Sequence, residues 1–203
     1  MRRGNRHALI ITDLPFMSYS TITDAVSAAR QVMQAGAQMI KIEGGAWLAD
    51  TVRVLAQGGI PSCVHLGLTP QSVNVFGGYK VQAKTRSAAD ALLADCEAVV
   101  AAGATMLLLE CVPVKAAQEV QARFGVPVIG IGAGKYCDGQ VLVMQDMLGL
   151  NFGKPARFVR NFLQEQLHGQ QGENPIVEAF KSFHESVRQG DYPAPEHTFQ
   201  IDL

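Results

Sequence analysis

The sequence shows no excess of charge of either sign and no long apolar run. Its 203 residues include 17 Lys and Arg against 18 Asp and Glu, for a net charge of −1. This balance excludes a basic surface for nucleic acid and a polybasic membrane patch. No stretch approaches the ~20 apolar residues of a membrane span. The apolar run after the basic start is shorter than the ~7–15 residues of a signal-peptide core. We therefore expect a cytoplasmic protein.

The chain also lacks paired cysteines. Its four cysteines form no CxxC motif and match no zinc-site spacing. They are Cys63, Cys96, Cys111 and Cys137. We expect reduced, buried thiols rather than disulfides or a metal site. Hydrophobic residues make up 48% and charged residues 17% of the chain, which indicates a globular protein with a substantial core.

What is present is an alternation of short apolar runs with helix-like stretches. The apolar runs lie at 8–12, 39–43, 61–65, 106–110, 126–131 and 140–144, and the helix-like stretches at 21–35, 46–57, 88–102, 115–124, 154–167 and 174–189. Short apolar runs bounded by Gly or Pro are typical of buried parallel strands. The pattern predicts one domain over residues 1–203, as a doubly wound sheet or a (β/α)8 barrel.

Four of the expected strands end in ionisable residues, which are Asp13, the pair Lys41 and Glu43, His65, and Glu110. In both folds the carboxyl ends of the strands form the mouth where chemistry collects. Lys41 and Glu43 are two apart and therefore share a face of their strand. Inward charges are costly unless they are paired or bind a ligand. The two form either a structural ion pair or a site for an anion at Lys41 and a cation or proton at Glu43.

Each of the other three residues has a functional and a structural interpretation. Asp13 precedes Leu14-Pro15 and is either an oxygen ligand for Mg²⁺ or a turn or capping aspartate. Glu110 follows three leucines and is either a general acid/base or half of a rim ion pair. His65 binds substrate, carries protons or is a satisfied core histidine. The long loop after His65, up to about residue 87, is a potential lid.

Six ordered motifs resemble the ketopantoate hydroxymethyltransferase family. They are DLPFM at 13–17, KIEGG at 41–45, HLGLTPQSVN at 65–74, FGGYKVQ at 76–82, LECVP at 109–113 and IGIGAG at 129–134. The resemblance implies a (β/α)8 TIM barrel of the phosphoenolpyruvate/pyruvate-binding type with its first two βα units missing from this chain. Strands three to eight and the C-terminal helices would then form the single barrel domain, assembled into a homodecamer.

The resemblance also implies an activity, namely transfer of a hydroxymethyl group from 5,10-methylenetetrahydrofolate to 3-methyl-2-oxobutanoate, giving 2-dehydropantoate in pantothenate biosynthesis. By match, Asp13 binds Mg²⁺ and substrate, and Glu43 is a further metal-site carboxylate. Lys41 and His65 are substrate-binding, and Glu110 is the catalytic acid/base. A 2-oxo acid can chelate Mg²⁺, which then stabilises the enolate that attacks the one-carbon unit.

Two alternatives to this enzyme stay open at the level of sequence. One is a catalytically inactive, truncated remnant that only associates with intact subunits. The other is a different enzyme of the same superfamily, such as a lyase acting on a 2-oxo or dicarboxylic acid.

Overall fold

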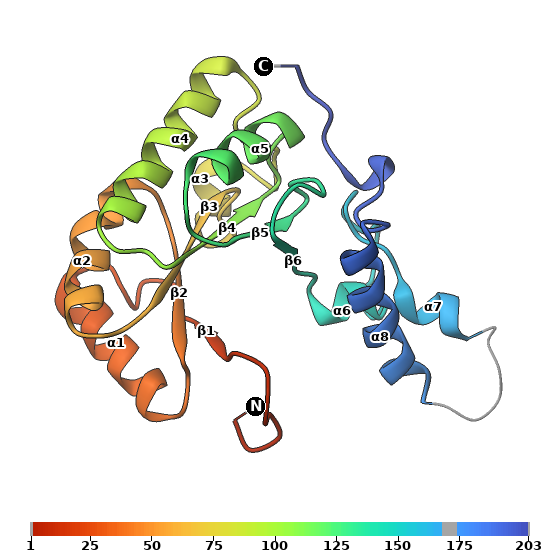
Figure 1. Ribbon diagram of the computed structural model, residues 1–203, viewed down its shortest axis with the longest axis horizontal. Helices are drawn as coiled ribbons and strands as arrows, with labels where there is room; N and C mark the ends of the chain where they lie inside the picture. The colour runs from red at the N-terminus through yellow and green to blue at the C-terminus, as the bar shows by residue number, and fades with distance from the viewer. Residues whose placement is uncertain (1, 168–173, 203) are drawn as a thin grey trace.

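The computed structural model describes residues 2–167 and 174–202, and a parallel sheet forms its centre. The six strands found there pair in the order in which they occur along the chain. They are β1 (Ile11–Asp13), β2 (Met39–Glu43), β3 (Ser62–Gly67), β4 (Met106–Glu110), β5 (Val128–Ile131) and β6 (Gly139–Gln140). The sheet curls, and Figure 1 shows it between two groups of helices. The predicted α/β class and the parallel strands are confirmed.

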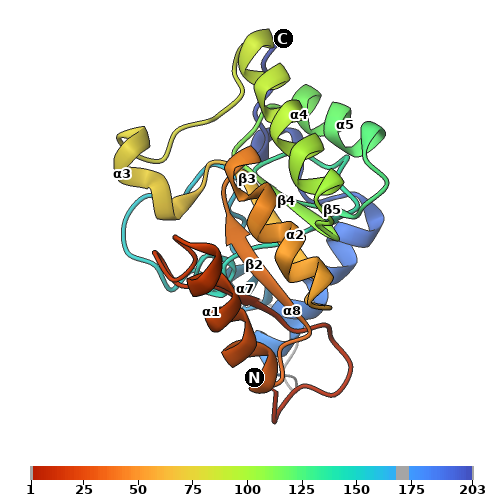
Figure 2. The same cartoon turned by 90° about the vertical axis from the view of Figure 1, so that its left-hand side faces the viewer.

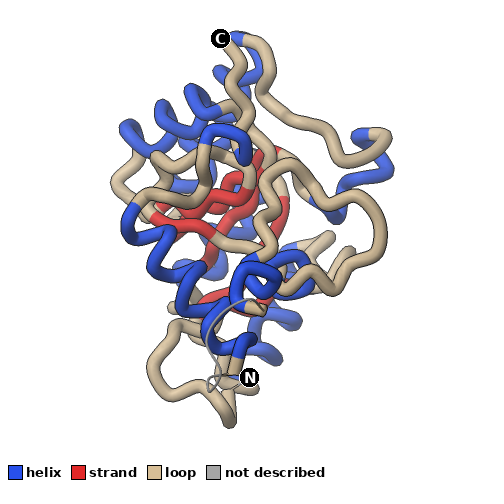
Figure 3. Tube along the Cα trace, turned by 90° about the vertical axis from the view of Figure 1, so that its right-hand side faces the viewer, coloured by secondary structure: helices blue, strands red, loops and turns tan. Residues whose placement is uncertain are grey.

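Helices connect most of the strands. The connecting helices are α1 (Ile22–Gln34), η1 (Ala46–Leu48), α2 (Ala49–Gln57), η2 (Pro70–Ser72), α3 (Val73–Phe76), α4 (Arg86–Ala101) and α5 (Val114–Arg123). The C-terminal part contains α6 (Met144–Met147), α7 (Phe162–Gln166), α8 (Pro175–Gln189) and η3 (Pro195–His197). Figure 1 shows α1, α2, α4 and α5 on one side and α6 to α8 on the other, and Figure 3 shows the strands in the middle.

Local capping explains where the main connecting helices begin. The Thr21 side chain accepts a hydrogen bond from the backbone N–H of Asp24 at the start of α1. Thr85 does the same for Ala88 at the start of α4. A hydroxyl at the N-cap satisfies a helix N–H that otherwise has no partner in the helix. These two caps fix where the chain leaves the loops that follow β1 and β3.

The two faces of the sheet pack against different partners. Ile40 and Ile42 belong to the larger core cluster, with buried side chains of the helices. Met39, Cys63 and Leu108 belong to a second cluster on the opposite face, where loop residues such as Phe158 cover the sheet. Side chains alternate along a strand, so Lys41, Glu43, His65 and Glu110 share this second face. This second face thus carries an apolar layer, and a charged layer lies next to it at the carboxyl ends of the strands.

Three expected elements differ most from the structure. The predicted strand at 140–144 is wrong, because β6 covers only Gly139–Gln140 and α6 begins at Met144. Within the described residues β6 pairs with β5 alone, and the chain turns after β5 at Gly132, whose φ is 62°. The predicted helix at 154–167 is shorter, because Asn161 caps α7 and helix starts only at Phe162. The first strand lies at Ile11–Asp13 rather than 8–12.

The described strands form an open sheet, with β1 and β6 at its edges. The structure therefore shows about half of a barrel rather than a closed one. Within the described residues, no helix is long and apolar enough to span a membrane. All four cysteines are free and buried, as the sequence predicted.

Candidate active site

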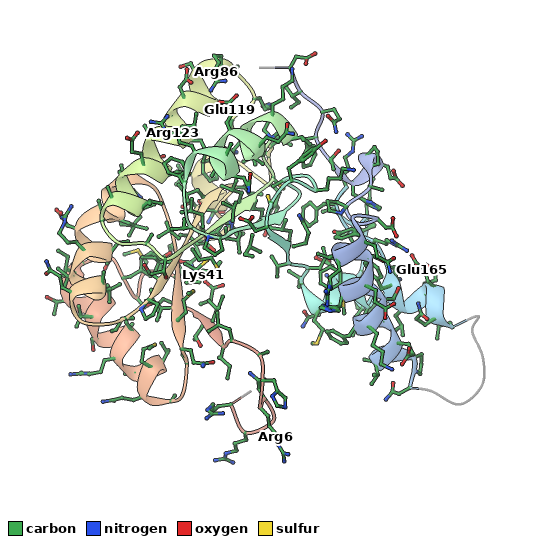
Figure 4. The ribbon with its side chains drawn as sticks, viewed as in Figure 1. Arg6, Lys41, Arg86, Glu119, Arg123 and Glu165 are labelled. Carbon is green, nitrogen blue, oxygen red and sulfur yellow. The ribbon has the colours of Figure 1, made fainter. Side chains whose placement is uncertain are left out.

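The structure brings all five sequence-predicted site residues together at the carboxyl ends of four adjacent strands. The strand register places Asp13 beside Lys41, and Glu43 beside His65. Glu110 ends the next strand, β4. In Figure 4, Lys41 is labelled on β2, on the side of the sheet away from α1 and α2. The parallel order of the sheet is what makes residues far apart in sequence neighbours here.

Lys41 lies between two carboxylates. Its Nζ donates to both oxygens of Asp13, at 2.6 and 2.7 Å, and to Oε1 of Glu43 at 3.2 Å. The Asp13 side chain is 56% exposed, whereas that of Glu43 is 5% exposed. The prediction that Lys41 and Glu43 share a face is therefore confirmed. Water screens the pair with the exposed Asp13 more than the pair with the buried Glu43.

His65 connects two buried carboxylates. Its Nδ1 lies 3.5 Å from Oε1 of Glu43, and its Nε2 lies 3.2 Å from Oε2 of Glu110. Neither ring nitrogen has a partner in good hydrogen-bond geometry among the described residues, so the contacts are mainly electrostatic. Burial alone lowers the pKa of His65, but the contacts with Glu110 and Glu43 outweigh it and raise this pKa above its usual value. The arrangement therefore favours an imidazolium between two carboxylates.

Glu43 stays ionised despite its burial. Burial opposes ionisation, but His65, the backbone N–H of Gln71 and Lys41 together lower the pKa of Glu43 below its usual value. The Gln71 N–H donates to Oε2 of Glu43 at 2.9 Å, so both carboxylate oxygens have partners. A buried charge with this many partners is compensated rather than exposed to an apolar core.

Two residues that sequence reasoning missed hold the cluster in place. Tyr19 donates its hydroxyl proton to Oε1 of Gln71 at 2.6 Å, and Gln71 Nε2 donates to the Leu14 carbonyl at 3.0 Å. The backbone N–H of Glu43 donates to the Tyr19 oxygen at 3.3 Å. Burial raises the pKa of Tyr19 to about 12, so its proton stays on. These bonds tie the loops that follow β1 and β3 to the end of β2.

The backbone of Glu110 is fixed by a close approach of two strands. Leu68 N–H donates to the Glu110 carbonyl at 2.9 Å. A Cβ on Gly67, whose φ is +84°, would lie 2.4 Å from that carbonyl oxygen. Cys111 follows with a φ of 49°, a conformation that costs a non-glycine residue of order 1–3 kcal/mol. Gly67 is thus required for the position of Glu110.

The side chains at this site offer few oxygen ligands for the Mg²⁺ that the sequence predicts. Among the described residues, no group of three or more His, Cys, Asp and Glu side chains could hold a metal ion. Asp13 and Glu43 nevertheless converge on one cation, the Lys41 ammonium. Mg²⁺ is commonly held by one or two carboxylates, with substrate oxygens and water as further ligands. The two carboxylates fit an ion of that kind but not one held by protein ligands alone.

Parallel strands whose carboxyl ends carry a linked set of ionisable side chains define an enzyme of the α/β class. Residues 1–195 match the family model described as "Ketopantoate hydroxymethyltransferase". The chain belongs to the ketopantoate hydroxymethyltransferase family.

Curated relatives agree with this assignment. A 3-methyl-2-oxobutanoate hydroxymethyltransferase of Acinetobacter baylyi is 67% identical over 204 residues, covering 100% of this chain and 74% of that protein. Enzymes of the same name from Psychrobacter sp. (strain PRwf-1) and, with the suffix 2, from Hahella chejuensis are 59% and 54% identical. They are covered over 73% and 74% of their lengths. The chain therefore spans about three quarters of the length of these relatives.

Similarity to solved structures is weaker. A putative phosphonomutase from Burkholderia cenocepacia J2315 superposes with a TM-score of 0.47 and 17% identity, over 62% of this chain and 54% of that one. At this level of similarity nothing about function follows.

Proposed function

We propose that this protein transfers a hydroxymethyl group from 5,10-methylenetetrahydrofolate to 3-methyl-2-oxobutanoate, giving 2-dehydropantoate and tetrahydrofolate with the uptake of one water. The observation that carries the proposal is the linked cluster of Asp13, Lys41, Glu43, His65 and Glu110 in a member of this family. A 2-oxo acid brings a carboxylate and a keto oxygen, which need positive charge, and a C3 proton, which needs a base.

The chain's own residues have distinct roles in this proposal. The Lys41 ammonium binds the 2-oxo acid and offsets the negative charge that develops on its keto oxygen. Glu110 takes the C3 proton, and the carbon so activated forms the new C–C bond with the one-carbon unit. His65, between Glu110 and Glu43, positions the Glu110 carboxylate and lines the substrate site. The apolar layer that includes Met39, Cys63 and Leu108 on the same face of the sheet excludes water, and this strengthens each of these interactions.

Asp13 and Glu43 would hold Mg²⁺, with Asp13 also in contact with the substrate. When bound, this ion supplies Lewis-acid polarisation of the keto group. Because Asp13 is exposed, it is open to an ion or a substrate that enters from solvent. We propose that the ligands of the protein are small molecules, namely the 2-oxo acid and the folate. We also propose that it is a cytoplasmic homo-oligomer, which by family resemblance is a decamer.

The proposal is tested by mass spectrometry of the product. The wild-type chain is incubated with 3-methyl-2-oxobutanoate, 5,10-methylenetetrahydrofolate and Mg²⁺, and 2-dehydropantoate is quantified. Glu110→Gln is expected to lower its formation at least ~100-fold, as loss of a general base does. Glu119→Gln is the matched control, because Glu119 pairs with Arg86 on the outer helices, away from the cluster (Figure 4).

The second candidate is the inactive remnant that associates with intact subunits. An open sheet with edge strand β1, which favours pairing with another chain, is the observation behind it. Absence of product from the wild-type chain, with product from an intact relative under the same conditions, would favour this candidate.

A further inference from the structure

A cavity of about 290 Å³ opens beside Glu43, between the loops that follow β2 and β3 and helices α3 and α4. Figure 2 shows how far α3 stands from α4 on this side of the molecule. The residues that line the cavity include Glu43, Trp47, Phe76 and Asp95. Ligand pockets commonly measure ~300–1,000 Å³, so this one has room for a ring system and not for a large ligand. Of these four side chains, only Glu43 has a role in the chemistry described above.

Two glycines shape this cavity. A Cβ on Gly44 would lie 2.7 Å from the indole ring of Trp47, so the ring rests directly against the backbone that follows Glu43. A Cβ on Gly45 would lie 2.4 Å from the Asp95 carboxylate. Any larger residue at either position would displace the indole or the carboxylate. The Gly-Gly pair therefore brings an aromatic ring and a negative charge to the same small space.

Both groups are available to a ligand. Trp47 is 63% exposed, although its large apolar surface favours a partner. One Asp95 oxygen, Oδ1, accepts the Ala46 N–H at 2.7 Å. Across residues 2–167 and 174–202, no donor reaches the other oxygen. An indole face beside a carboxylate acceptor suits a flat heterocycle that carries adjacent N–H donors.

We propose that this cavity binds the pterin ring of the folate co-substrate. The ring packs against Trp47, and the amino-pyrimidinone edge of the pterin donates its N–H groups to Asp95. Because Glu43 lines both this cavity and the charged cluster, the one-carbon unit lies next to the 2-oxo acid. The aminobenzoyl-glutamate tail stays outside, since the cavity is too small for it. This inference rests on the proposed function, of which it specifies the folate site.

Binding can be read directly, because Trp47 is the single tryptophan of the chain. The fluorescence of Trp47 is titrated with 6-methyltetrahydropterin, tetrahydrofolate and p-aminobenzoylglutamate. A free tryptophan derivative is titrated in parallel to correct for light absorbed by the probes. Saturable quenching is expected with the first two probes and not with the third, which lacks the pterin. Quenching by p-aminobenzoylglutamate alone, or by none of the three, would overturn the proposal.

Kinetics separate the folate site from the 2-oxo acid site. Trp47→Ala and Asp95→Asn are expected to raise the KM for 5,10-methylenetetrahydrofolate on the order of tenfold, the scale of a lost ring stack. Trp47→Phe is expected to restore most of the affinity. Asparagine at position 95 keeps an oxygen for the Ala46 N–H, so a merely structural role would leave KM unchanged. Asp90→Asn, on the same helix and paired with Arg86, is the matched control.

The two proposals fail in different ways. Proton exchange at C3 of the 2-oxo acid needs no folate, so it is measured on the same variants. Persistent exchange with a raised folate KM supports the pterin site. An unchanged folate KM in both variants overturns this site and leaves the proposed function standing. Absence of both exchange and transfer in the wild-type chain overturns the proposed function, and the fluorescence titration then still decides whether the cavity binds a pterin.

Discussion

Replacement of Lys41 by methionine should destabilise the protein mainly through Glu43. Methionine has about the length of the lysine stem but no charge, so the change isolates the ammonium group. Removing one partner of a buried ion pair costs ~3–5 kcal/mol. Glu43 keeps the Gln71 N–H and the His65 contact, so we expect the lower end of this range, about 3 kcal/mol. Asp13 is exposed, and its pair with Lys41 contributes only ~0–1 kcal/mol.

The assay is urea unfolding followed by circular dichroism at neutral pH. Lys41→Met, Asp13→Asn and Glu43→Gln are compared alone, and Lys41→Met is repeated in the Glu43→Gln background. A double-mutant cycle isolates the coupling of Lys41 with Glu43. We expect Lys41→Met to cost clearly less when Glu43 has already lost its charge. Equal costs in both backgrounds, or an Asp13→Asn cost as large as that of Lys41→Met, would refute the reasoning.

Three further predictions concern the residues around this pair. The pKa of His65 is raised in the folded state, so protonation of this residue stabilises the fold. This contribution is complete below the ordinary histidine pKa of 6.5 and is lost as the pH rises through the pKa of the folded state. His65→Gln should therefore cost more free energy of unfolding at about pH 5.5 than at about pH 9, and equal costs would contradict this. Gly67→Ala should destabilise by ~2–5 kcal/mol, from a strained φ and a clash with the Glu110 carbonyl, and a wild-type urea midpoint would contradict it. Gln71→Ala should cost ~1–3 kcal/mol by leaving Tyr19 and the Leu14 carbonyl without their partner. Tyr19→Phe in that background should add a further cost in the same assay, because the Glu43 N–H then loses its acceptor, and a wild-type urea midpoint for Gln71→Ala would contradict the reasoning.

The sequence predicted some elements to the residue and others poorly, for physical reasons. β2 at Met39–Glu43 and β4 at Met106–Glu110 match the predicted ranges. Both are apolar runs with a strand on each side, so burial and pairing determine their ends. In the part of the chain that the structure describes, β6 pairs with one strand, and its two residues carry almost no hydrophobic signal. At the edge of the sheet, the local sequence pattern therefore does not determine which residues pair as a strand.

The site residues could be predicted because their positions follow from strand register. Ionisable residues at the ends of adjacent parallel strands must meet, and Asp13, Lys41, Glu43, His65 and Glu110 do. Their individual roles remain predictions, since register fixes proximity and not chemistry.

Tyr19 and Gln71 could not be predicted in the same way. Both lie outside the strands, and their hydrogen bond spans 52 positions of the sequence. Only the folded loops show that they meet. No periodicity or spacing in the sequence marks a contact of this kind.

The most direct test of the central claim, that the charged cluster removes the C3 proton of a 2-oxo acid, is hydrogen–deuterium exchange. 3-Methyl-2-oxobutanoate is incubated with the protein in D₂O containing Mg²⁺, and loss of the C3 proton signal is followed by NMR. The account predicts exchange by the wild-type chain, retained in Glu119→Gln and lost at least ~100-fold in Glu110→Gln. Exchange that is no faster than without protein, or that is undiminished in Glu110→Gln, would contradict it.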